Sequence, residues 1–227
     1  MKKSPLVKIH LIIISVLFIL IASSCKKDDA DTTVTDIDGN VYNTVSIGLQ
    51  VWMKENLKTT KYNDGTAIPN VTDNTAWRNS TTSAYCWYDN DISNKELYGA
   101  LYNWYAVNTG KLCPKGWHSP TDAELTTLSD CLGGDDIAGG KLKEMGTTHW
   151  ASPNEDATNE SGFTALPGGY RNWDGNFNHA GSYTCIWSSS ELNDLEAWFR
   201  EIYGWKPDFT NSEDVKEYGF SVRCVKD

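Results

Sequence analysis

The sequence predicts an α+β fold in which short strands at both ends of the chain flank a helical middle, with long loops between them. Loosely alternating β-rich pieces occupy residues 34–53, and helical periodicity is confined to residues 94–145. From residue 150 onward, short β pieces separated by Gly, Asn and Asp return. Strands grouped at the two ends argue against a wound parallel sheet, in which strands and helices alternate.

Residues 1–24 are typical of a signal peptide. Three lysines precede an apolar run from Leu11 to Ile21. This run is short beside the roughly 20 apolar residues that span a bilayer as a helix. The small residues Ala22-Ser23-Ser24 follow, and Cys25 comes next. This order resembles the bacterial lipobox, with Ala22 in place of the usual leucine. The resemblance implies cleavage before Cys25 and lipidation of that residue; the alternative is an ordinary secreted protein with an incidental cysteine.

Residues 25–33 are predicted to form a short polar tether between the lipid and the fold. Lys26–Asp29 resembles the export signal that sends Bacteroidota lipoproteins to the outer face, with a solvated charge run as the alternative. A triacylated Cys25 would hold the chain stably on a membrane. We therefore expect a lipid-anchored protein of the outer membrane or cell surface.

The mature chain is strongly acidic. The whole chain has a formal net charge of −10, and removal of residues 1–24 takes away three lysines and no acid, which makes the charge −13. A chain of this charge is repelled by phosphate backbones, so nucleic acid is not an expected partner. Residues 34–227 are long enough for one hydrophobic core and are expected to form a single domain.

The N-terminal part of this domain is predicted to be β structure followed by loop. Residues 34–53 read as a hairpin or meander, with turn signals at Asp38-Gly39 and Ile47-Gly48. Residues 58–91 are rich in Thr, Asn, Asp and Ser and show no sustained period, which predicts a long ordered loop with short strands.

Two main helices are predicted in the middle of the chain. In residues 94–111, four apolar side chains fall on one helical face and a Thr-Gly pair follows as a stop. The second helix begins at Thr121 and Glu124, which have the spacing of a capping box, and ends at Gly133-Gly134. A short third helix is expected at Lys141–Met145.

Short strands are predicted again in the C-terminal part. They lie in the stretches FTALPGGY (163–170), YTCIWSS (183–189), EAWFREI (196–202) and GFSVRCV (219–225).

Residues 98–125, 160–177 and 218–227 resemble the Fibrobacter succinogenes major paralogous domain, and residues 36–71 fit the same family pattern. The resemblance covers nearly all of the mature chain. The sequence departs from the pattern at Leu125, where the family usually has Trp, and in two additional cysteines.

A more distant likeness concerns the fold. Residues 99–125 are similar to the helix, turn and "LPTEAEW" helix start of formylglycine-generating sulfatase-modifying enzymes, and residues 219–225 are similar to their closing strand. This likeness implies a C-type-lectin-like architecture, in which the chain ends near where it begins and a loop-rich region, here residues 150–205, presents the working surface.

The same likeness argues against catalysis. Those enzymes bind copper through two cysteines shortly before the closing strand, whereas residues 191–223 of this chain contain no cysteine. We therefore expect a protein that is not an enzyme and that needs no cofactor and no metal. A hydrolase or a sulfatase-modifying-type enzyme is a distant alternative.

Five cysteines remain after lipidation, and outside the cytoplasm they are expected to form disulfides. With one cysteine free, fifteen pairings are open, and spacing alone does not choose among them. The fold likeness implies a Cys113–Cys224 bridge, because Cys113 leads into the helix beside the closing strand. The two cysteines extra to the family pattern, Cys131 and Cys185, form the second predicted pair, which leaves Cys86 free.

The candidate ligand-binding residues lie in the glycine-rich stretch GGYRNWDGNF. Tyr170 and Trp173 are predicted to offer rings on which a sugar can stack, and Asp174 and Asn176 to hydrogen-bond the same ligand. The alternative is a tight turn whose aromatic rings pack on the core. Together with the anchor, this stretch predicts a surface module that binds a neutral extracellular glycan. A structural or adhesive protein with a protein partner is the alternative function.

Overall fold

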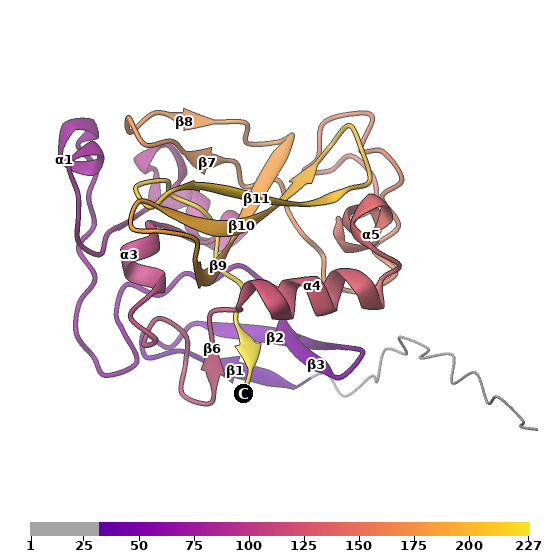
Figure 1. Ribbon diagram of the computed structural model, residues 1–227, viewed down its shortest axis with the longest axis horizontal. Helices are drawn as coiled ribbons and strands as arrows, with labels where there is room; N and C mark the ends of the chain where they lie inside the picture. The colour runs from indigo at the N-terminus through magenta and orange to yellow at the C-terminus, as the bar shows by residue number, and fades with distance from the viewer. Residues whose placement is uncertain (1–31) are drawn as a thin grey trace, which may run out of the picture.

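The computed structural model describes residues 32–227. The described chain contains five α-helices and twelve strands (Figure 1), so the predicted α+β class is confirmed. The helices are α1 (Asn74–Arg78), α2 (Lys95–Tyr98), α3 (Trp104–Val107), α4 (Asp122–Cys131) and α5 (Asp135–Leu142). The strands are β1 (Thr33–Thr35), β2 (Val41–Ile47), β3 (Gln50–Met53), β4 (Tyr85–Cys86), β5 (Leu101–Tyr102), β6 (Trp117–His118), β7 (Tyr170–Arg171), β8 (Phe177–Asn178), β9 (Tyr183–Glu191), β10 (Glu196–Tyr203), β11 (Phe209–Val215) and β12 (Val225–Lys226).

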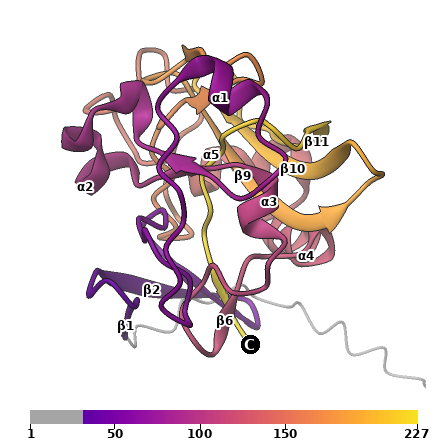
Figure 2. The ribbon, with the colours of Figure 1, turned by 90° about the vertical axis from the view of Figure 1, so that its left-hand side faces the viewer.

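An antiparallel sheet joins the two ends of the fold. Its strand order is β1-β2-β3-β12-β6, so the last strand of the chain lies between the N-terminal hairpin and β6 (Figure 1), and the C-terminus lies close to β6 (Figure 2). Val225 pairs with Trp52 on one side and with His118 on the other. The predicted hairpin at residues 34–53 and the expectation that the chain ends near where the fold begins are both confirmed.

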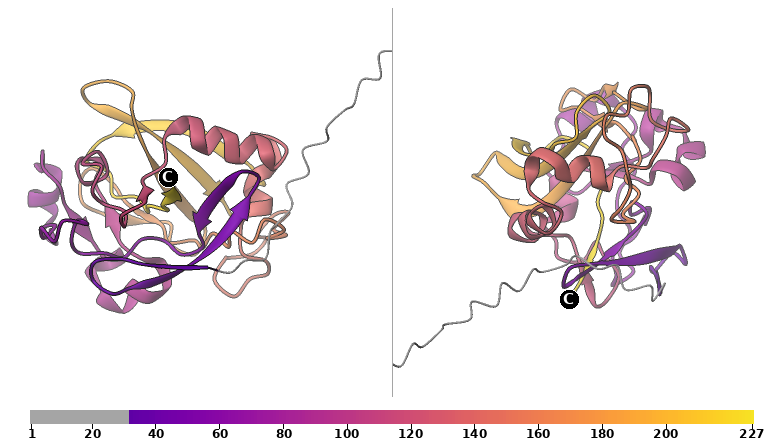
Figure 3. Two further views of the ribbon diagram at one scale, coloured as in Figure 1. Left: turned by 90° about the horizontal axis from the view of Figure 1, so that it is seen from below. Right: turned by 90° about the vertical axis from the view of Figure 1, so that its right-hand side faces the viewer.

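A second antiparallel sheet, β11-β10-β9, organises the rest of the molecule. Helices α4 and α5 pack against one face of it (Figure 3), where Ile186, Ile202 and Phe209 join the leucines of α4 in one buried cluster. Side chains alternate along a strand, so Tyr183, Cys185 and Phe199 point to the opposite face and enter a different cluster. This opposite face is rich in aromatic residues.

The second predicted helix is confirmed, and the third lies elsewhere than predicted. The Thr121 hydroxyl accepts from the Glu124 backbone N–H while the Glu124 carboxylate accepts from the Thr121 N–H, so the capping box forms and starts α4. The third helix, α5, runs over Asp135–Leu142 instead of residues 141–145. Its two internal glycines are required by packing, because a Cβ on Gly139 would lie 2.0 Å from the carbonyl oxygen of Asp208.

The single helix predicted over residues 94–111 is wrong. The chain forms the short helix α2, then strand β5, then the short helix α3. The break falls at Gly99, whose φ of +74° does not fit a helix and whose Cβ position is filled by the backbone of Leu57 at 2.8 Å. Asn103 then caps α3 by accepting from the Ala106 N–H. Tertiary contacts therefore override the helical pattern here.

The predicted C-terminal strands are confirmed in β9 and β10. In the stretches 163–170 and 219–225, regular pairing is limited to the ends, at β7 and β12. The strand β11, with the polar sequence FTNSEDV, was not predicted from the sequence.

The cysteines confirm one predicted bridge and refute the other. Cys113 and Cys224 form a disulfide whose Cα atoms lie 6.0 Å apart. Cys185 is a free, buried thiol, so the predicted Cys131–Cys185 bridge is wrong. The reason is topological: Cys185 belongs to the cluster on one face of the β9–β11 sheet, and Cys131 packs against the cluster on the other. Cys86 is free, as predicted.

The predicted signal peptide, the lipidated Cys25 and most of the tether lie outside the described residues. Within residues 32–227, no helix is long and apolar enough to span a bilayer.

An ion-pair cluster fixes the C-terminus beside α4 and predicts a pH effect. Burial lowers the pKa of His118, but hydrogen bonds to the carboxylates of Asp227 and Glu124, at 2.7 and 2.8 Å, outweigh it and raise the pKa above 6.5. The stabilisation that protonated His118 gives the fold is therefore fully present below the unfolded-state pKa of this residue. It is lost as pH rises through the higher folded-state pKa.

We expect the difference in unfolding free energy between wild type and His118→Gln to shrink as pH rises from about 6 to about 9. Urea denaturation of both proteins across this range measures it. A difference that stays constant or grows with pH would contradict the assignment.

Candidate functional site

The predicted ligand-binding residues lie on the β7–β8 hairpin and the turn that closes it. The turn is held internally: the Asn176 amide Nδ2 donates to the Asp174 carboxylate at 2.9 Å, and the Asn176 backbone N–H donates to both Asp174 and Asn172. Gly175 is required because a Cβ there would lie 2.7 Å from the Cα of Asn74. The turn is therefore pressed against the start of α1.

Arg171 fastens this hairpin to the loop that leads into α1. Its side chain is fully buried, and its guanidinium donates to the carbonyl oxygens of Gly175, Val71 and Thr72 at 2.8, 2.6 and 3.0 Å. The same group lies 4.4 Å from the ring centroid of Trp77. Burial lowers the pKa of Arg171, because it disfavours the charged guanidinium. Hydrogen bonds to backbone carbonyls stabilise this buried charge, a role that an acidic side chain usually fills. One side chain thus sets the distance between the β7–β8 turn and α1.

Between that turn and α1 the surface is hollowed. We call this the Trp173 hollow; it has a volume of about 360 Å³ and is lined by Arg78, Asn79, Trp173, Asp214, Val215, Glu217 and Tyr218. The Trp173 side chain is 43% exposed, and the Arg78 guanidinium lies 4.9 Å from its ring centroid. Trp173 is therefore held by a cation–π contact while part of its ring faces solvent.

The charged groups of the Trp173 hollow are one cation, Arg78, and two acids, Asp214 and Glu217. Burial raises the pKa of the Asp214 carboxyl. Burial together with the charge of Asp214 raises the pKa of Tyr218 to about 12. Glu217 is fixed in place, since its carboxylate accepts from the Tyr105 hydroxyl at 3.0 Å and its backbone oxygen accepts from the Trp77 indole at 2.7 Å. The wall therefore places charged donors and acceptors around an exposed ring, and of these Glu217 is held in position by its hydrogen bonds.

A second hollow is entirely aromatic. We call it the Tyr203 hollow; it measures about 260 Å³ and is lined by Tyr170, His179, Tyr183, Tyr203 and Trp205. Trp205, in the β10–β11 turn, is 51% exposed. Its ring stacks on Tyr183 with an interplanar angle of 9° and lies 5.1 Å from the ring of Tyr203. Gly169 is required beside this hollow, because a Cβ there would lie 2.4 Å from the Asn178 carbonyl oxygen.

A carboxylate underlies the Tyr203 hollow. Glu201 accepts hydrogen bonds from the hydroxyls of Tyr183 and Tyr203 and from Ser212 at 2.8 Å. Burial, with the negative charges nearby, raises the pKa of both tyrosines. The phenols therefore stay neutral and oriented with their hydroxyls toward Glu201.

The two hollows lie on the same face of the β9–β11 sheet. Tyr170 lines one and Tyr218 the other, and their ring centroids are 5.9 Å apart. The predicted set is thus divided: Trp173 and Tyr170 line different hollows, and Asp174 and Asn176 appear in the described wall of neither.

Both exposed tryptophans of the described chain line a hollow. All ten tryptophans lie in the described part of the chain, and only Trp173 and Trp205 are exposed. Trp104 and Trp187 are buried, as a core role requires, and Trp117 and Trp198 are partly buried. Exposing the large apolar ring of a tryptophan to water is unfavourable and contributes nothing to the core. Both exposed rings are therefore candidates for ligand contact.

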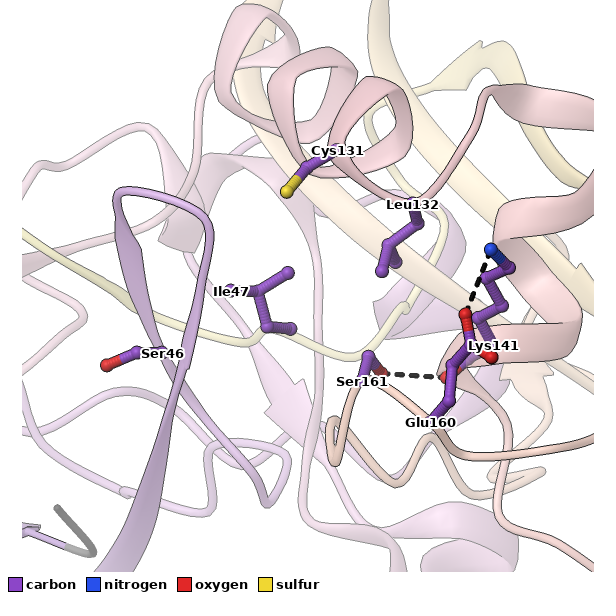
Figure 4. Close-up of a pocket in the computed structure, with 7 residues that line it drawn as sticks. All are labelled: Ser46, Ile47, Cys131, Leu132, Lys141, Glu160 and Ser161. Atoms are coloured by element: carbon purple, nitrogen blue, oxygen red, sulfur yellow. Dashed lines mark hydrogen bonds and ion pairs between the residues drawn. The ribbon is translucent and has the colours of Figure 1, made fainter. Parts of the chain in front are cut away.

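A third hollow, of about 210 Å³, lies between β2, the end of α4 and α5 (Figure 4). Its charged groups, Lys141 and Glu160, pair with one another at 2.9 Å, and Ser161 donates to the Lys141 carbonyl. None of the described residues in its wall is aromatic. Residues 32–227 also contain no group of three or more His, Cys, Asp or Glu side chains that could hold a metal ion.

Reasoning from the sequence missed the residues that complete the hollows. Arg78 is on α1, Asp214 is on the unpredicted strand β11, Tyr203 ends β10, and Trp205 lies in the turn that follows. One signal was available: Gly204-Trp205 places a tryptophan beside a glycine at the end of a predicted strand, as GGYRNWDGNF does for Trp173.

The chain was compared with known families and proteins. The model of the Fibrobacter succinogenes major domain matches residues 45–226. No curated protein and no solved structure matches the chain significantly. The match covers most of the chain and includes β3, helices α4 and α5, and the whole β9–β11 sheet. The protein therefore belongs to the Fibrobacter succinogenes major domain family.

Proposed function

We propose that this protein is a surface-anchored, non-catalytic module that binds a neutral extracellular glycan in the Trp173 hollow. The observation that carries the proposal is the exposed ring of Trp173, which the Arg78 guanidinium contacts at 4.9 Å from the ring centroid and which shares its hollow with charged and polar side chains. A sugar presents an apolar face of C–H groups and a rim of hydroxyls, and this hollow offers a partner for each.

Charge restricts the class of glycan. The wall of the Trp173 hollow has one cation against two acids, and the mature chain has a formal charge of −13. An acidic polysaccharide would be repelled by the chain as a whole. A neutral glycan is not repelled by this negative charge. Its hydroxyls can donate to Asp214 and Glu217 and accept from Arg78.

The proposed architecture is C-type-lectin-like. Two features support it: the C-terminal strand β12 pairs with the N-terminal hairpin, and residues 150–205 contribute Tyr170, Trp173 and Trp205 to the hollows. The proposed location is the outer membrane or cell surface, with the signal peptide removed and Cys25 lipidated. This part of the proposal rests on the sequence of residues 1–25.

A neutral-polysaccharide array tests the proposal. Wild type should bind at least one neutral glycan, and Trp173→Ala should bind it about tenfold more weakly, because loss of the aromatic contact removes roughly 1.5 kcal/mol. Trp205→Ala, which truncates the other exposed tryptophan, is the matched control and should bind as wild type does. Equal binding by wild type and Trp173→Ala would reject the Trp173 hollow as the site, and binding by neither would reject the glycan function and favour the protein-partner alternative.

A further inference from the structure

We propose that the Tyr203 hollow is a separate site for an alkylated ammonium group, such as the head group of choline. The first support is its wall. Every described side chain that lines it is aromatic, and the negative faces of such rings attract a cation whose centre lies within about 6 Å of the ring centroid. The Tyr203 and Trp205 centroids are 5.1 Å apart, and those of Tyr183 and Tyr203 5.0 Å. A single cation in this hollow can therefore contact several rings.

The second support is the carboxylate beneath the rings. Glu201 accepts from the hydroxyls of Tyr183 and Tyr203, and a phenol that donates to an anion becomes richer in electrons on its ring faces. Ser212 fixes Glu201 from β11 at 2.8 Å. The negative charge of Glu201 and the ring quadrupoles therefore act in the same direction, toward a cation.

The third support is a cation that the protein itself places on this aromatic group. The Lys206 ammonium lies 4.0 Å from the ring centroid of Tyr203, and it is paired with Asp208 at 2.8 Å. The Tyr203 ring thus accepts a cation in this structure. Lys206 is not among the residues that line the hollow, so the space within the hollow is left for a ligand.

The hydrogen-bond pattern selects an alkylated ammonium over a primary one. The Glu201 oxygens already accept three hydroxyl hydrogen bonds, and the wall is made of aromatic side chains. A primary ammonium would lose hydration here and gain few acceptors for its three N–H groups. A trimethylammonium group has no N–H to satisfy, and its methyl groups pack on the rings.

Calorimetric titration with three probes tests this site. Choline should bind saturably, 3,3-dimethylbutan-1-ol, its uncharged analogue of the same shape, about tenfold more weakly, and ethanolamine, its primary-ammonium analogue, more weakly than choline. Equal binding of choline and the neutral alcohol would show an apolar pocket without cation recognition. Tighter binding of ethanolamine, or no choline binding, would also overturn the proposal.

Variants locate the binding. Trp205→Ala, at an exposed turn residue, should weaken choline binding about tenfold, and Trp173→Ala should leave it unchanged. Glu201→Gln should weaken binding of choline and leave that of the neutral alcohol unaltered, with circular dichroism confirming the fold. Unchanged choline affinity in Trp205→Ala would contradict the site. The glycan proposal is independent, because it depends on Trp173 and predicts the opposite response to these two alanine variants.

Discussion

Replacing Cys113 and Cys224 together with alanine should lower the free energy of unfolding by roughly 2–5 kcal/mol. The bridge joins positions 111 residues apart in sequence, so it removes much of the freedom of the unfolded chain. In the folded chain it lies beside the β6–β12 pairing, which attaches the last strand to the rest of the sheet. Urea denaturation under non-reducing conditions measures the loss.

The two single variants provide the control for this prediction. Cys113→Ala and Cys224→Ala each remove the same bridge, so each should lose nearly as much stability as the double variant. Losses that add, or a loss below about 1 kcal/mol in the double variant, would show that the bridge contributes little and that the effect comes from side-chain truncation.

Arg171→Met should cost about 3 kcal/mol or more of unfolding free energy and should also disrupt the Trp173 hollow. The substitution leaves the carbonyls of Val71, Thr72 and Gly175 without their donor in a buried site. It also releases the β7–β8 turn from the loop before α1, so Trp173 and Arg78 lose their fixed separation. Chemical denaturation and the glycan array together measure both effects.

Arg78→Met is the matched control for Arg171→Met. Arg78 carries the same charge but is exposed at the end of α1, so its replacement should change stability by no more than about 0.5 kcal/mol. Its effect should fall on glycan binding alone. Equal destabilisation by the two substitutions would contradict the structural role assigned to Arg171.

Local signals account for the elements that the sequence predicted well. Helix α4 is encoded by a capping box whose two partners are three residues apart, Thr121 and Glu124, and β9 and β10 are long strands that contain several aromatic residues. Where a distant contact decides the structure, the sequence misled. Gly99 breaks a helical pattern because its backbone packs closely against that of Leu57. No property of residues 94–111 indicates this contact.

The candidate site shows the same division. Trp173 was predicted from its glycine-rich turn, which is a local feature. Its neighbours Arg78 and Asp214 come from α1 and β11, and β11 escaped prediction because Thr210, Ser212 and Asp214 make one of its faces polar. That polar face is what the hollows use: Asp214 lines one, and Ser212 fixes the carboxylate beneath the other.

The most direct test of glycan binding is a ¹⁵N-indole titration of the protein with a neutral oligosaccharide selected on the array. Each of the ten tryptophans gives an indole signal in this spectrum, and only Trp173 and Trp205 are exposed. The signal that is missing from each alanine variant assigns these two. We expect the Trp173 indole signal to shift saturably while the Trp205 signal stays in place. A saturating shift at Trp205 with none at Trp173, or no shift at either, would contradict glycan binding in the Trp173 hollow.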